Sequence, residues 1–158
     1  MEIERKFLIK DLPADMDSYD HIIMEQGYLT TDPVVRVRSE KRVYRSGPKE
    51  EIDYVLTYKG KGLMAREEYN LPLTREAYDS LIKKTEGNII SKKRLLIPFE
   101  KYMIELDIFK EPFAPLILAE VEFDSLEEAD SFIPPKWFSE EVTNDPSYHN
   151  SSMSKRVF

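Results

Sequence analysis

The stretch Glu2-Ile3-Glu4-Arg5-Lys6-Phe7, at the start of a chain of 158 residues, places charged side chains at every second position. A β-strand directs successive side chains to opposite faces, so Glu2, Glu4 and Lys6 share one face, while Ile3 and Phe7 share the other. The same charged spacing recurs at Arg36 and Arg38, at Lys92 and Arg94, at Glu105 and Asp107, and at Glu120, Glu122 and Asp124. The chain therefore contains several strands that each have one charged face and one apolar face.

The signs of these charges indicate where the charged faces lie. For any single strand, a half-buried strand with its charged face in water is the simpler interpretation. A solvated sheet face usually mixes signs to form cross-strand pairs, yet two of these strands carry purely basic pairs and two carry purely acidic ones. The pattern permits an inverted barrel, whose apolar face packs outward under helices and whose charged face lines a cavity, and this is the arrangement that we predict.

Alternating runs between turn signals predict eight strands, at residues 2–10, 22–30, 34–45, 52–60, 64–72, 89–98, 101–110 and 116–124. Short connections favour antiparallel pairing, and closure removes exposed edges. One helix is predicted from a Thr74 cap to about Glu86, a second from a Ser125 cap to Pro134-Pro135, and a third near 147–157. We expect an α+β, mainly β protein, an eight-stranded antiparallel closed barrel with a charged lumen and flanking helices, in a single domain of residues 1–158.

The composition excludes several classes of protein. Thirty acidic residues against 23 basic ones give a net charge of −7, which disfavours a nucleic-acid binder. Because there is no cysteine and only two histidines, His21 and His149, we exclude thiol nucleophiles, cysteine-bound zinc and multi-histidine metal sites, and expect both histidines at the surface. The N-terminal residues lack an apolar signal region, and no apolar run is long enough to span a bilayer, so we expect a cytoplasmic protein without membrane contact.

The two kinds of charge have complementary chemistry. Basic side chains suit an extended polyanion, and the predicted basic wall comprises Lys6, Arg36, Arg38, Lys92 and Arg94. Carboxylates suit a hard divalent cation such as Mg²⁺, and the predicted acidic wall comprises Glu2, Glu4, Glu105, Asp107, Glu120 and Glu122. Together the two walls indicate a metal-dependent site for phosphoryl chemistry.

The order of the motifs resembles that of a known family. Glu2-Ile3-Glu4-Arg5-Lys6 matches the E-x-E-x-K signature of the CYTH family, the triphosphate tunnel metalloenzymes. The motifs that follow in the family's order are Gln26-Gly27-Tyr28-Leu29, Arg36-Val37-Arg38, Leu56-Thr57-Tyr58-Lys59, Arg66-Glu67-Glu68-Tyr69, Lys92-Lys93-Arg94, Glu105-Leu106-Asp107, Glu120-Val121-Glu122 and the segment 137–143. The resemblance covers essentially the whole chain and implies an eight-stranded tunnel that binds triphosphate with Mg²⁺ or Mn²⁺.

The resemblance also implies roles for individual residues. It implies metal ligands at Glu2, Glu4, Glu120 and Glu122, phosphate contacts at Lys6, Arg36, Arg38, Lys59, Lys92 and Arg94, and further tunnel carboxylates at Glu68, Glu105 and Asp107. Glu4, Lys92 and Tyr28 are the candidate catalytic residues, because Lys92 and Tyr28 match a lysine–tyrosine pair that activates water in some short bacterial members. Asn70 departs from the pattern, since it stands where the family has a second carboxylate after Glu68.

The predicted activity is divalent-metal-dependent hydrolysis of a small-molecule triphosphate, with inorganic tripolyphosphate, cleaved to pyrophosphate and phosphate, as the preferred substrate. Class IV adenylate cyclase and thiamine triphosphatase are the enzymatic alternatives on the same tunnel. A non-enzymatic polyphosphate- or triphosphate-binding module is a third alternative, which would lack the metal carboxylates that are intact here. The sequence leaves open whether the protein forms a homodimer, and whether its C-terminal helix, with Tyr148 and Asn150 as site candidates, plugs the tunnel or only packs against it.

Overall fold

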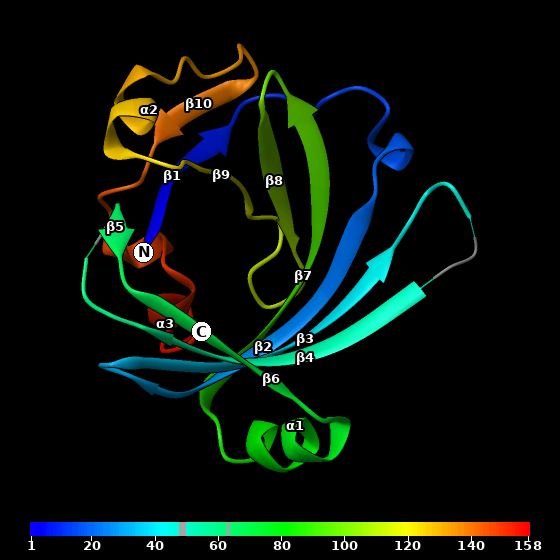
Figure 1. Ribbon diagram of the computed structural model, residues 1–158, viewed down its shortest axis with the longest axis vertical. Coiled ribbons are helices and arrows are strands. Elements are labelled where there is room, and N and C mark those ends of the chain that lie inside the picture. The colour runs from blue at the N-terminus through cyan, green and yellow to red at the C-terminus, as the bar shows by residue number, and fades with distance from the viewer. Residues whose placement is uncertain (48–49, 63) are drawn as a thin grey trace.

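The computed structural model describes residues 1–47, 50–62 and 64–158, which form one antiparallel sheet of ten strands around a central space (Figure 1). The strands are β1 (Glu2–Ile9), β2 (His21–Thr31), β3 (Val34–Val43), β4 (Glu50–Lys59), β5 (Ala65–Arg66), β6 (Glu68–Leu73), β7 (Glu86–Phe99), β8 (Tyr102–Phe109), β9 (Ile117–Glu122) and β10 (Phe138–Glu141). Their order in the sheet is β10-β1-β9-β8-β7-β2-β3-β4-β6.

The sheet closes into a barrel through the short strand β5. β6 pairs with β4, and β5, separated from β6 only by Glu67, pairs with β1 through Glu2–Arg66 and Ile3–Ala65. β5 and β6 therefore act as one interrupted strand between β4 and β1, and the predicted closed antiparallel barrel is confirmed. The number of strands differs from the predicted eight because the strand expected at 64–72 is interrupted at Glu67, and because β10, which was not predicted, pairs with the outer end of β1.

Three short helices and two single turns flank the barrel: α1 (Arg75–Ile82), α2 (Leu126–Ser131), α3 (Asn150–Met153), η1 (Met16–Ser18) and η2 (Pro146–Tyr148). The predicted caps Thr74 and Ser125 are confirmed, since each hydroxyl accepts a hydrogen bond, 3.1 Å long, from the backbone N–H three residues later. α1 ends at Ile82 rather than near Glu86, because Glu86 begins β7 and pairs with Tyr28. No helix within the described residues combines the length and the apolarity that a bilayer span demands.

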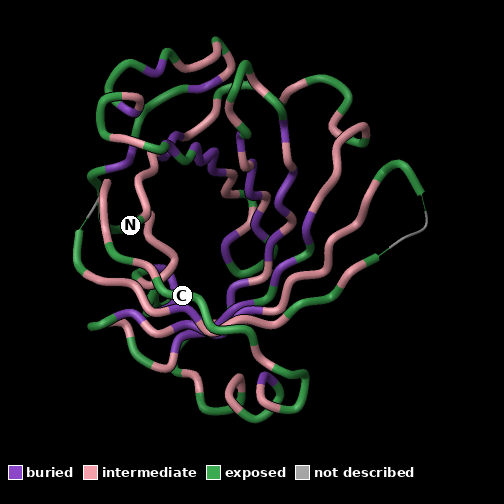
Figure 2. The backbone as a smooth tube through the Cα atoms, viewed as in Figure 1, coloured by how far each residue is buried: buried purple, intermediate pink, exposed green. Residues whose placement is uncertain are grey.

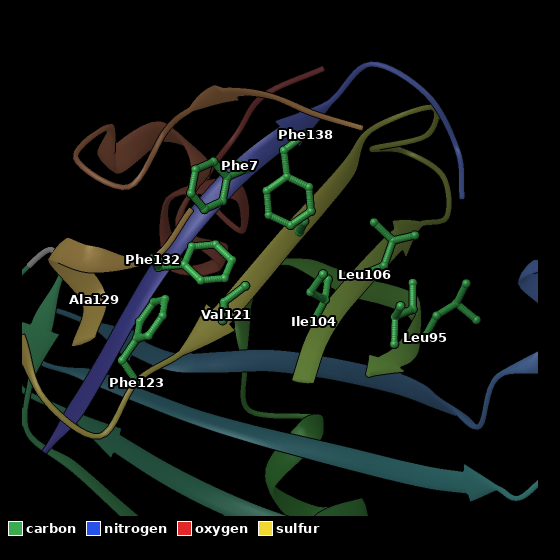
Figure 3. Packing of buried hydrophobic residues seen from close by; sticks show 11 residues of the cluster. Phe7, Leu95, Ile104, Leu106, Val121, Phe123, Ala129, Phe132 and Phe138 are labelled. Carbon is green, nitrogen blue, oxygen red and sulfur yellow. The ribbon is translucent and has the colours of Figure 1, made fainter. Parts of the chain in front are cut away.

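The main apolar core lies outside the barrel. The outer faces of β1, β7, β8 and β9 pack under α2 and β10, where Figure 3 labels Phe7, Leu95, Ile104, Leu106, Val121, Phe123, Ala129, Phe132 and Phe138. These residues alternate along the strands with charged ones, as Leu106 does between Glu105 and Asp107. Removing such a side chain from water stabilises the fold by about 1.5–3 kcal/mol. Figure 2 shows the buried stretches along the barrel strands, and the predicted charged lumen follows from this outward-facing core.

Towards one end, the lumen changes from charged to apolar. Ile90, Phe109 and Leu118 occupy inward positions of β7, β8 and β9, two residues away from the charged positions Lys92, Asp107 and Glu120. They pack in one cluster with Met153 of α3, which is fully buried. The C-terminal helix therefore both packs against the barrel and plugs this end of the lumen.

Tight backbone contacts hold this C-terminal segment on β7. Asn88 Nδ2 donates to the carbonyl oxygens of Met153 at 3.2 Å and of Arg156 at 2.8 Å. Gly87 has a φ of 75°, and a Cβ atom there would lie 2.1 Å from the carbonyl oxygen of Ser154. Only glycine tolerates this conformation and this approach together. The closed end of the lumen therefore depends on the close packing of β7 against the last residues of the chain.

Candidate active site

A polar cavity occupies the charged part of the lumen. Among the residues predicted from the sequence, it is lined by Glu2, Glu4, Lys6, Tyr28, Arg36, Arg38, Lys59, Glu68, Arg94, Glu105, Glu120 and Glu122. Asn150, one of the two C-terminal site candidates, also lines the cavity, whereas Tyr148, the other, does not. Arg66, His149 and Ser151 complete the lining. Lys92 and Asp107 do not reach it. Most of the predicted residues therefore converge on one cavity, because each occupies an inward position of its strand.

Three carboxylates from three neighbouring strands meet in this cavity. One oxygen atom each of Glu2 in β1, Glu68 in β6 and Glu122 in β9 lies within 4.8 Å of the other two. Asn70 Nδ2 donates to Glu68 Oε1 at 3.3 Å, so the residue that replaces the family's carboxylate orients Glu68 instead of adding a charge. Three carboxylate oxygens without nitrogen or sulfur donors are a set that fits a hard divalent cation.

The predicted set of four metal ligands is divided by the structure. Glu2 and Glu122 belong to the group with Glu68, whereas Glu4 and Glu120 line the cavity outside it. In the register of β1 and β9, Glu4 lies opposite Glu122, and Lys6 lies opposite Glu120. Lys6 Nζ is 3.4 Å from Glu120 Oε1. Glu120 therefore has a cation of the protein beside it, while the carboxylates of Glu2, Glu68 and Glu122 lie close to one another.

Burial and mutual repulsion raise the pKa values of the carboxyl groups of Glu4 and Glu122. Burial, reinforced by the charges of Glu120 and Glu2, raises the pKa of Glu4 to about 8. Burial, together with four neighbouring glutamates, raises the pKa of Glu122 to about 7. Burial also opposes ionisation of Glu2, but Lys59 Nζ, 2.9 Å from its Oε1, lowers the pKa of Glu2 overall. A divalent cation in this cavity would neutralise the same carboxylates and replace their protons.

The raised pKa of Glu4 predicts a pH-dependent difference in stability between the wild type and Glu4→Gln. The folded protein binds the proton of Glu4 more tightly than the unfolded chain does. The stabilisation that comes from this proton is complete below about pH 4 and is lost as the pH rises to about 8. The free energy of unfolding of the wild type, measured with urea in EDTA at each pH, should therefore fall relative to that of Glu4→Gln between these limits. A difference that is constant across this range would contradict the raised pKa.

Two arginines in the cavity lack partners for part of their guanidinium groups. The buried Nε atoms of Arg36 and Arg66 have no hydrogen-bond partner, and no carboxylate within the described ranges lies at ion-pair distance from either residue. Arg36 Nη2 donates to Thr57 Oγ1 at 3.1 Å. Burial, together with the charge of Arg36, lowers the pKa of Arg38 to about 10. Buried N–H groups without partners are unfavourable, so this excess of donors and positive charge favours a bound anion.

Lys92 and Asp107 form a buried ion-pair group beneath the cavity. Lys92 Nζ lies 2.7 Å from Asp107 Oδ2, and Arg94 donates to both oxygens of Asp107, from Nε at 2.7 Å and from Nη2 at 2.9 Å. Both Lys92 and Asp107 are fully buried. Burial lowers the pKa of Lys92 to about 7, although the charge of Asp107 opposes this shift. No hydrogen bond within the described residues joins Lys92 to Tyr28, so the structure presents Tyr28 and Arg94 to the cavity and holds Lys92 behind them.

His149, predicted at the surface, is half-buried and lines both the cavity and the cleft beside it. Burial, with the positive charges of Lys6, Arg66 and Lys59, lowers the pKa of His149 to about 4, so the ring is neutral at pH 7. Arg66 was not predicted as a site residue either. Arg66 lies two residues before Glu68, so both belong to the same face of the strand pattern. This spacing could have identified Arg66 as a site residue. His149 follows η2 in an irregular segment, where the sequence carries no comparable period.

An antiparallel barrel whose lumen joins unpaired arginines to a group of carboxylates defines a tunnel protein suited to a polyanion and a divalent cation. The model of the CYTH domain matches residues 1–133, and the chain belongs to this family. The resemblance drawn from the motifs is thereby confirmed. The residues beyond 133 are also part of the barrel structure, because β10 pairs with β1 and α3 plugs the lumen.

Two curated relatives and two solved structures show what this chain is similar to. It is 38% identical over 159 residues to the inorganic triphosphatase of Nitrosomonas europaea, covering 99% of this chain and 98% of that protein. It is 32% identical over 164 residues to the inorganic triphosphatase of Acetivibrio thermocellus, covering 99% and 95%. The crystal structure of the inorganic triphosphatase NE1496 matches with a TM-score of 0.68 and 33% identity, covering 99% of this chain and 96% of that one. A putative adenylate cyclase from Bacillus halodurans, with a TM-score of 0.53, 16% identity and coverage of 100% and 93%, is similar in fold alone.

Proposed function

We propose that this protein hydrolyses inorganic tripolyphosphate to pyrophosphate and phosphate in a reaction that requires Mg²⁺ or Mn²⁺. The observation that carries the proposal is the presence, in one cavity, of arginines without anionic partners and of a carboxylate group that fits a divalent cation. The names of the two curated relatives support the same activity. In this proposal the whole chain, residues 1–158, acts as one domain.

The basic residues of the cavity bind and orient the phosphate chain. Arg36 and Arg66 offer donors that are not used within the protein, and Arg38, Lys6, Lys59 and Arg94 add positive charge around them. Guanidinium groups bind phosphate oxygens through two N–H groups at once, which fixes the orientation of the chain as well as its position. Lys92 and Asp107 lie behind these cavity residues. Asp107 pairs with Lys92 and accepts a hydrogen bond from Arg94, and it thereby holds Arg94 in place.

Glu2, Glu68 and Glu122, with Glu4 and Glu120 beside them, would hold the divalent cation. A cation bound there supplies charge neutralisation on the phosphate oxygens and lowers the pKa of water. The oxygen of a water molecule bonds to a terminal phosphorus, the bond from that phosphorus to the bridging oxygen breaks, and pyrophosphate leaves. In this proposal a carboxylate oxygen of Glu4 accepts the proton that the water releases. The water-activating role of the Lys92–Tyr28 pair stays a prediction.

The lining of the cavity favours an inorganic chain over a nucleotide. Two aromatic rings, those of Tyr28 and His149, lie on the lining of this cavity among the described residues; Tyr28 is buried against the apolar end, and His149 is half-buried. A nucleoside substrate requires a surface on which its base can stack. Inorganic tripolyphosphate needs only the charges and donors that the cavity offers, and it therefore fits this lining better than ATP does.

The purified protein should release phosphate from tripolyphosphate in the presence of Mg²⁺ or Mn²⁺ and should be inactive in EDTA. Tripolyphosphate, ATP, thiamine triphosphate and pyrophosphate are compared at equal concentration, and phosphate, pyrophosphate and cyclic AMP are measured separately. We expect the fastest release of phosphate from tripolyphosphate. Cyclic AMP and pyrophosphate as the products from ATP would identify a cyclase instead, and tight binding without turnover of any substrate would identify a binding module.

A further inference from the structure

Two clefts meet the central cavity, and their charges are opposite. The first, which we call the acidic mouth, shares Glu2, Glu68, Glu105 and Glu122 with the cavity and continues to Asp124 and Glu128. The second, which we call the basic cleft, shares Lys59, Arg66, His149 and Ser151 with the cavity and continues to Lys61 in the loop after β4. The two clefts have similar volumes, about 690 and 540 Å³, so charge distinguishes them more than size does.

The acidic mouth repels a phosphate chain. Among the described residues that line it, Lys101 is the one with a basic side chain. Lys101 Nζ lies 2.7 Å from Glu128 Oε1, so Glu128 neutralises part of the charge of Lys101. The amino group of Met1 is the other positive charge beside these six carboxylates. A polyanion that approaches this mouth therefore meets a net negative potential before it reaches the arginines of the cavity.

The basic cleft attracts the same chain. Asp32 is its one acidic residue among the described lining residues, against Lys59, Lys61 and Arg66. Neither Arg66 nor Lys61 has a carboxylate at ion-pair distance within the described residues, and the Nε atom of Arg66 is buried without a partner where cleft and cavity meet. Met153 and its buried apolar neighbours pack together at the apolar end of the lumen. The side opening is thus the basic approach to the cavity.

We propose that the phosphate chain enters and leaves the cavity through the basic cleft, between the β2–β3 turn, the loop after β4 and the C-terminal segment, and not through the acidic mouth. This inference rests on the proposed function and adds the route of the substrate to it. Lys61 acts as an exposed guiding charge at the outer end of the cleft, since it lies outside the cavity lining. Because such guidance acts through the potential of the solvent-exposed surface, added salt weakens it.

The test makes the same charge change at each opening. Lys61→Glu should lower kcat/KM for tripolyphosphate about 5- to 10-fold at about 20 mM KCl and less than about twofold at about 300 mM KCl, with kcat unchanged. Lys101→Glu, the matched control at the acidic mouth, should change kcat/KM by less than about twofold at either salt concentration. Equal losses in the two variants, or a larger loss in Lys101→Glu, would overturn the proposed route.

Failure of the proposed function is distinguishable from failure of the route. If the wild type does not hydrolyse tripolyphosphate with either metal, the proposed function is wrong, and the route is then tested by measuring the association rate constant of tripolyphosphate for the same three proteins in EDTA, by ³¹P NMR exchange. The association rate constant should fall about 5- to 10-fold in Lys61→Glu at low salt and stay within about twofold in Lys101→Glu. Equal association rate constants in all three proteins would again overturn the route.

Discussion

Replacement of Glu4 by glutamine should lower kcat/KM for tripolyphosphate hydrolysis by about 100- to 10,000-fold. Glutamine keeps the shape of the side chain, but it removes both the negative charge and the oxygen that we propose as the proton acceptor. Glu4 lines the cavity and lies opposite Glu122 in the β1–β9 register, so it is next to the group formed by Glu2, Glu68 and Glu122. The measurement is phosphate release at saturating Mg²⁺, with Glu140→Gln, an exposed residue of β10, as the matched control.

The same variant should fold at least as well as the wild type in EDTA. Glu4 is buried beside Glu120 and Glu2, and a neutral amide removes this repulsion. Loss of activity with retained or increased stability would therefore separate a functional role from a structural one. Wild-type rates in Glu4→Gln would show that another group accepts the proton and that the cation does not need this carboxylate.

Asp107→Asn should produce the largest loss of stability, about 3–5 kcal/mol in the free energy of unfolding. Asp107 is fully buried and is the shared partner of Lys92 and Arg94, so a neutral side chain leaves Lys92 buried without its counter-charge. In a domain of this size, this corresponds to a fall in Tm of roughly 6–20 °C. The free energy is measured by urea unfolding in EDTA, so that metal binding does not contribute.

Two further variants show whether this effect comes from the buried charge. Asp124→Asn makes the same change at an exposed position just after β9 and should alter stability by less than about 0.5 kcal/mol. Adding Lys92→Met to Asp107→Asn removes the buried amino group that has lost its counter-charge and should recover part of the loss. A single Asp107→Asn variant as stable as the wild type would contradict the role of this ion pair in the fold.

The alternation of charged and apolar residues predicted the barrel and the inward faces of its strands. The period of two fixes the face of each residue, and this is why Glu2, Arg36, Arg94 and Glu120 all line the cavity as expected. The period does not fix how far along the lumen a residue lies. Lys92 and Arg94 have equivalent faces, yet Lys92 is paired in register with Phe109, at the apolar end, whereas Arg94 is paired with Asp107.

The features missed from the sequence depend on tertiary contacts. The interruption of the strand at Glu67 arises because β5 and β6 pair with different neighbours, and a single strand pattern carries no signal for this change of partner. β10 is short and gains its order from β1. The position of His149 likewise depends on the docking of the last residues on β7. Gly87 permits this docking, but a glycine in the sequence does not by itself predict it.

The position of β1 in the sheet also constrains how the chain assembles. β1 contains the first residues of the chain, but along most of its length its neighbours are β9 and β10, more than 100 residues later. Contacts between such distant segments form late, because a long loop must close before they gain any stability. Glu2 and Glu4 therefore meet Glu122 only when the first 122 of the 158 residues are present. A shorter nascent chain cannot complete this carboxylate arrangement, so the binding site is finished late in folding.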